Sequence, residues 1–157
     1  MLADTQLAMD QNAAAVQTLS RLEPSQTNDM TQTLLGIALA RTGQTAQAGQ
    51  IAGKLAAPPD AGPSLLYAQA RLRAATGDTA QATRLLAACF EATLPSLLEG
   101  FKAHARECPE FAAIASGPEF ARALETRSKV PESKCSGGSS CAGCPMSGKC
   151  PRSQASQ

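Results

Sequence analysis

Apolar positions in this chain gather in segments of helical length, separated by glycine, proline and polar turn residues. The apolar residues are mainly alanine and leucine, with few of the aromatic and β-branched residues that sheets favour. This pattern predicts an all-α fold with helices at about 3–22, 28–42, 45–57, 64–76, 79–92 and 95–106.

One heptapeptide occurs twice in the chain with a single change. Residues 42–48 are Thr-Gly-Gln-Thr-Ala-Gln-Ala and residues 76–82 are Thr-Gly-Asp-Thr-Ala-Gln-Ala, so six of the seven positions are identical. The two copies lie 34 residues apart, and Pro24 and Pro58 are also 34 residues apart. A period of about 34 residues is typical of a repeated helix-turn-helix unit, so the helices are predicted to form an array of antiparallel pairs.

The repeated positions carry large apolar residues, small residues where two helices meet, glycine where the chain turns, and proline after the second helix. In the first copy these positions are Leu35, Gly36, Leu39, Gly43, Ala48 and Pro58, and in the second they are Ala70, Gly77, Ala82 and Leu86. The order of these residues resembles the repeat pattern of the tetratricopeptide repeat family. The resemblance implies a TPR-like α-solenoid that binds a protein or peptide in a groove formed by the first helix of each repeat. The implied partner-binding residues are Gln32, Leu39, Gln69 and Arg73.

The two ends of the repeat array differ in kind. Residues 3–22 align with the second helix of a repeat, because Ala14 lies one repeat period before Ala48, and the partner of this helix is missing. An unpaired apolar face predicts partner contact, self-association or a truncated array. After Pro95 the repeat register is lost, and residues 95–128 are predicted to form a C-terminal cap. We therefore expect a helical repeat domain at 1–128 and a cysteine-rich tail at 129–157.

The charge balance excludes two classes of partner. Fourteen basic and thirteen acidic residues give a net charge of +1, which offers no electrostatic reason to bind nucleic acid or an anionic membrane. No apolar run is long enough to cross a bilayer, and the N-terminus lacks the features of a signal peptide. These observations predict a cytoplasmic protein whose thiols stay reduced.

Four cysteines lie within sixteen residues of the tail, at Cys135, Cys141, Cys144 and Cys150. The residues between them are small or polar and cannot form an apolar core. Cys141 and Cys144 form a C-x-x-C chelate, and glycine-rich loops allow the outer two cysteines to reach the same centre. The spacing therefore predicts a metal site.

The identity of the bound group stays open between two main candidates. Zinc would take four thiolates in a tetrahedral site, but such sites usually pair two C-x-x-C knuckles and this chain has one. An iron–sulfur cluster suits the five-residue outer loops better, and Cys144 and Cys150 are each followed by proline, as in bacterial ferredoxin motifs. We favour the cluster, with zinc close behind. The remaining alternatives are a disulfide clip, a thiol redox switch and a copper site.

No catalytic constellation occurs in the remaining sequence, so we do not expect an enzyme. Cys89 is predicted to be a buried small residue. His104 lies four residues before Cys108 and could pair with it, although an exposed histidine without a partner cysteine is the preferred interpretation. Glu107, Glu110 and Glu119 are interpreted as solvent-facing charges near helix ends.

Overall fold

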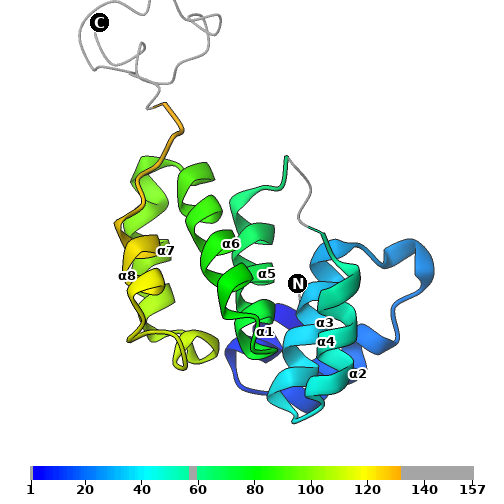
Figure 1. The fold of residues 1–157 in the computed structure, drawn as a ribbon. Helices are drawn as coiled ribbons and strands as arrows, with labels where there is room; N and C mark the ends of the chain where they lie inside the picture. The colour runs from blue at the N-terminus through cyan, green and yellow to red at the C-terminus, as the bar shows by residue number, and fades with distance from the viewer. Residues whose placement is uncertain (1, 57–59, 132–157) are drawn as a thin grey trace, which may run out of the picture.

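A computed structural model describes residues 2–56 and 60–131, and these residues form an all-helical structure (Figure 1). Its helices lie side by side, with α2–α4 at one end, α5 and α6 in the middle, and α7 and α8 at the other end. The longer elements are α3 (Asp29–Arg41), α4 (Thr45–Lys54), α5 (Pro63–Ala75), α6 (Thr79–Ala92) and α7 (Pro95–Glu107). The shorter ones are α1 (Leu2–Ala8), α2 (Asn12–Ser20), η1 (Pro24–Gln26), η2 (Pro109–Phe111) and α8 (Pro118–Glu125).

The five predicted helices from residue 28 to residue 106 are confirmed, with small differences at their ends. Local sequence explains the boundaries. Asn28 caps α3 by accepting a hydrogen bond from the Thr31 backbone, while α5, α7 and α8 each begin at a proline, whose missing N–H costs nothing there. Gly43 and Gly77 have φ angles of 84° and 85°, so both repeated glycines occupy the left-handed turn that was predicted for them.

The prediction of a single helix at 3–22 is wrong. The chain forms α1 and α2 instead, joined by a turn in which Asp10 adopts a φ of 58°. The Gln11 amide donates to the Gln6 carbonyl at 2.8 Å, as the Gln44 amide does to the Leu39 carbonyl at 2.8 Å. This turn is therefore equivalent to the later two, and α1 is a shortened first helix that packs on α2.

The new register makes Ala15, rather than Ala14, the equivalent of Ala48, and both Ala15 and Ala48 are fully buried. The helix taken to be unpaired therefore has a partner, and this reason for expecting self-association no longer holds. Self-association itself stays a prediction.

Buried apolar side chains form two clusters. One is built from α1–α4 together with Leu72 of α5, and the other from α5–α8 with η2. Leu72 extends the first cluster onto α5 where α3 crosses α5, and a Cβ atom built on Gly36 would lie 2.7 Å from Leu72 Cδ1. The small residue at Gly36 is what allows this close approach.

The C-terminal segment closes the second cluster. Phe111 and Phe120 are buried and Phe101 is partly buried. The chain remains attached beyond α8, since Ser128 Oγ donates to the Thr93 carbonyl and the Lys129 amide donates to the Glu91 carbonyl. Among the described residues, no helix has both the length and the apolar character needed to cross a bilayer.

Candidate functional site

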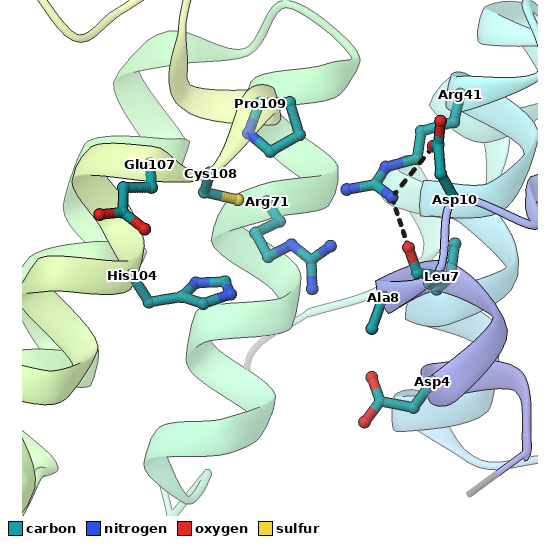
Figure 2. Close-up of a pocket in the computed structure, with 10 residues that line it drawn as sticks. All are labelled: Asp4, Leu7, Ala8, Asp10, Arg41, Arg71, His104, Glu107, Cys108 and Pro109. Carbon is teal, nitrogen blue, oxygen red and sulfur yellow. Dashed lines mark hydrogen bonds and ion pairs between the residues drawn. The ribbon is translucent and has the colours of Figure 1, made fainter.

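A polar cavity of about 650 Å³ opens where α1, α3, α5 and α7 come together (Figure 2). We call it the polar cavity. One wall is α1 with its following turn, which contributes Asp4, Leu7, Ala8 and Asp10, and the opposite wall is the end of α7 with residues 108 and 109. Arg41 and Arg71 reach the cavity from α3 and α5.

The two arginines share one buried carboxylate. Glu110 Oε1 accepts hydrogen bonds from Arg41 Nε at 2.8 Å and from Arg71 Nη2 at 3.2 Å, and its side chain is only 3% exposed. Glu110 Oε2 accepts a hydrogen bond from the Cys108 thiol at 2.8 Å. The short helix η2 packs against α5 and thereby places Glu110 beneath the cavity. The prediction that Glu110 is a solvent-facing charge is wrong.

Arg41 also connects the network to the first helix. Its Nη1 donates to the Leu7 carbonyl at 2.9 Å and lies 3.9 Å from a carboxylate oxygen of Asp10 (Figure 2). The Leu7 carbonyl lies in the last turn of α1, where a cation is favourable. Arg41 thus links α1 to η2 across the end of α3.

Charge and burial fix the protonation states of this network. Burial alone would raise the pKa of Glu110, but the Arg71 charge, the Cys108 thiol and the Arg41 hydrogen bond together lower it to about 2. Burial and the neighbouring Glu110 raise the pKa of Cys108 to about 11. At neutral pH the site therefore holds a carboxylate that is a poor base and a thiol that is not a nucleophile.

An aromatic residue lies beside the cavity and contacts its histidine. The Tyr67 hydroxyl is 2.6 Å from His104 Nδ1, and burial raises the pKa of Tyr67, so the phenol stays protonated. The Tyr67 ring also makes edge contacts with Phe101 and Phe111. His104 is exposed as expected, but its partner is Tyr67 of α5, and no hydrogen bond between His104 and Cys108 is found among the described residues.

A second cavity of about 290 Å³ adjoins the first, and we call it the apolar slot. Asp4 and Arg71 line both cavities, which places these two charges at the junction. The other residues that line the apolar slot are Met30, Leu34, Ser64, Tyr67 and Ala68. A ligand at the junction would therefore find charge on one side and apolar surface on the other.

The implied partner-binding residues lie away from these two cavities. Leu39 and Gln69 are 6% and 3% exposed, and Leu39 lines a separate cavity beside α2 and α4. Arg73 donates to the Leu55 carbonyl at 3.0 Å and pairs with Asp78, and Gln32 is partly exposed on α3. The residues of α3 and α5 that line the two cavities are Met30, Leu34, Arg41, Ser64, Tyr67, Ala68 and Arg71.

The cysteines divide into two groups. Cys89 is fully buried as predicted, and burial raises its pKa to about 11. Cys135, Cys141, Cys144 and Cys150 lie outside the described residues. Within residues 2–56 and 60–131, no group of three histidine, cysteine or acidic side chains is arranged to hold a metal ion. The predicted metal site therefore rests on the sequence of the tail.

Comparison with family models, with curated proteins and with solved structures found no significant match for this chain. The function must therefore be inferred from the geometry of the site. The most informative residues there, Arg41, Arg71 and Glu110, were not identified from the sequence. One signal for Arg71 was present, because it is a charged residue between the apolar Ala70 and Leu72 within a helix.

Proposed function

We propose that this chain is a tetratricopeptide-like binding protein and not an enzyme. Two features support the repeat assignment. The helix pairs α3–α4 and α5–α6 are joined by glycine turns one repeat period apart, and the α1–α2 turn has the same backbone hydrogen bond. The partner is a protein or a peptide, and its binding face is the side of α3 and α5 that carries Arg41 and Arg71.

The observation that carries this proposal is the unreactive state of three buried groups in and beside the polar cavity, Cys108, Glu110 and Tyr67. General acid–base catalysis needs a group with a pKa near the working pH, and nucleophilic catalysis needs an activated nucleophile. Here Glu110 is held as a carboxylate, and Cys108 and Tyr67 are held protonated. The cavity offers volume, charge and hydrogen-bond donors, which are the requirements of a binding site.

Blocking the cavity should abolish partner capture. Ala8 is exposed and lines the polar cavity, so Ala8→Trp fills the space without removing any core contact. We expect the immobilised variant to lose, by about tenfold or more in recovered amount, the proteins that the wild-type chain retains from a lysate. Ala121→Trp is the matched control, because Ala121 is exposed on α8 and lines neither cavity. Equal capture by all three proteins would contradict the assigned binding face.

We further propose that the tail binds an iron–sulfur cluster, or otherwise zinc, through Cys135, Cys141, Cys144 and Cys150. The protein would then be an accessory or assembly factor in the cytoplasm, docked to its partner by the helical array. The alternative is a pure interaction protein whose tail forms a disulfide clip or a thiol or copper switch. Reduced cytoplasmic thiols favour the metal.

Anaerobic purification followed by metal analysis separates these possibilities. A cluster gives brown protein with iron and acid-labile sulfide, and a zinc site gives colourless protein with about one zinc per chain. Replacing all four tail cysteines by serine should remove the bound metal. The helical circular dichroism should be unchanged, because the described helices close their own apolar clusters. Wild-type protein that is free of metal but captures its partner would contradict the metal proposal.

A further inference from the structure

The junction of the two cavities places a carboxylate and a guanidinium within reach of one small ligand. Figure 2 shows Asp4 of α1 and Arg71 of α5 directed toward the same space. Among the described residues, no hydrogen bond or ion pair engages the Asp4 carboxylate. Asp4 can therefore accept hydrogen bonds from a cationic group without breaking a contact that the fold needs.

Arg71 has hydrogen-bond donors at the same junction that Glu110 does not use. Its Nη2 donates to Glu110, while its Nε is buried and has no hydrogen-bond partner among the described residues. The Arg71 side chain is 13% exposed, so little water reaches it. The Nε is enclosed by protein atoms, so an oxygen acceptor that enters the cavity would bond to Arg71 through the terminal guanidinium nitrogens, which Figure 2 shows directed into this space.

The charges around the cavity select the kind of ligand. Asp4, Asp10 and Glu107 are acidic, Arg41 and Arg71 are basic, and the two arginines already share Glu110 below the cavity. A ligand that carries only negative charge would therefore be repelled from the rim. A ligand with a cation for Asp4 and an acceptor oxygen for Arg71 satisfies both sides of the junction.

We propose that the junction binds the N-terminal residue of a partner chain, and that this residue has an apolar side chain. Its α-ammonium group pairs with Asp4, its carbonyl oxygen accepts from Arg71, and its side chain enters the apolar slot between Leu34 and Tyr67. The first residue of a polypeptide carries all three groups on neighbouring atoms. The polar cavity is larger than one residue needs, which favours a polypeptide whose following residues continue past Asp10 and Glu107. This inference rests on the proposed binding face.

Three tripeptide amides test the proposal in the full chain. Leu-Ala-Ala amide carries the free ammonium group and the apolar side chain, N-acetyl-Leu-Ala-Ala amide lacks the ammonium group, and Ser-Ala-Ala amide lacks the apolar side chain. Titration into ¹⁵N-labelled protein, followed by amide chemical shifts, gives the affinity of each peptide. We expect the first peptide to bind about fivefold or more tightly than each of the other two.

Single substitutions with a matched control test which residues cause these two binding preferences. Asp4→Asn should remove the preference for the free ammonium group, and Asp60→Asn should keep it, because Asp60 is exposed and lines neither cavity. Ser64→Leu, which adds bulk in the apolar slot from an exposed position, should remove the preference for leucine over serine. Unchanged preferences in Asp4→Asn would overturn the assignment.

The remaining outcomes separate this inference from the proposed function. Equal binding of the free and acetylated peptides, or no binding of any peptide, overturns N-terminal recognition. The proposed binding face is then still judged by the capture experiment with Ala8→Trp. Free leucine that binds as tightly as Leu-Ala-Ala amide would make the occupant a free amino acid, and would overturn the assignment of a partner chain.

Discussion

Replacing Glu110 by alanine should lower the free energy of unfolding by about 3–5 kcal/mol. The carboxylate is the shared partner of Arg41 and Arg71, so its removal leaves Arg71 without a counter-ion and Arg41 with only the exposed Asp10 at 3.9 Å. Urea denaturation followed by circular dichroism at neutral pH measures the change. Glu119→Ala is the control, because within the described part of the chain Glu119 pairs only with the exposed Arg122, and its loss should cost less than about 0.5 kcal/mol. A loss below about 1 kcal/mol in Glu110→Ala would contradict the structural role of the network.

The same carboxylate should make the free energy of unfolding depend on pH in the acid range. Folding lowers the pKa of Glu110 from 4.5 to about 2. Its contribution is therefore complete above pH 4.5 and is lost as the pH falls from 4.5 to about 2. The shift corresponds to about 3 kcal/mol. Glu110→Gln should already be destabilised at neutral pH and should lose less further stability across this acid range. Parallel pH profiles of the two proteins would contradict this assignment.

Leu72→Ala should cost about 2–5 kcal/mol, and its effect should depend on the residue at position 36. In the wild-type background, Gly36→Ala places a methyl group against Leu72 Cδ1, and we expect a loss of about 1–3 kcal/mol. In the Leu72→Ala background the methyl group has room, and alanine gains about 1 kcal/mol in helix propensity over glycine.

A double-mutant cycle measures this coupling. Urea denaturation of the wild type, the two single variants and the double variant gives the interaction free energy directly. We expect the double variant to be about as stable as Leu72→Ala alone, or more stable. Losses that add within about 0.5 kcal/mol would show that α3 and α5 do not meet closely at these two residues.

The helices were largely predictable because their signals are local. Gly43 and Gly77 mark two turns, and prolines mark the first residue of α5, α7 and α8. The first turn was missed because Asp10 occupies the left-handed conformation there without a glycine. Aspartate tolerates this conformation better than most residues, but an aspartate in the sequence does not by itself predict a turn.

The candidate site could not be predicted in the same way, because the burial and the contacts of its residues depend on how the helices pack. Glu110 and Glu119 both lie in the sequence Pro-Glu-Phe at the start of a short helix. Glu110 is buried against two arginines and Glu119 is exposed. Only the position of η2 against α5 distinguishes them. Similarly, the repeat pattern placed Gln69 and Arg71 on one helix but did not show that Arg71 would face the cavity.

The division of the buried apolar residues into two clusters has a consequence for ligand binding. Each cluster can open with its own free energy, so amide hydrogen exchange in α1–α4 and in α5–α8 is free to proceed at different rates. The polar cavity draws its walls from both halves, with α1 and α3 on one side and α5 and α7 on the other. An occupant would have to be released before either half could open, so binding would strengthen the coupling that the Arg41–Glu110 pair and the α3–α5 crossing already provide.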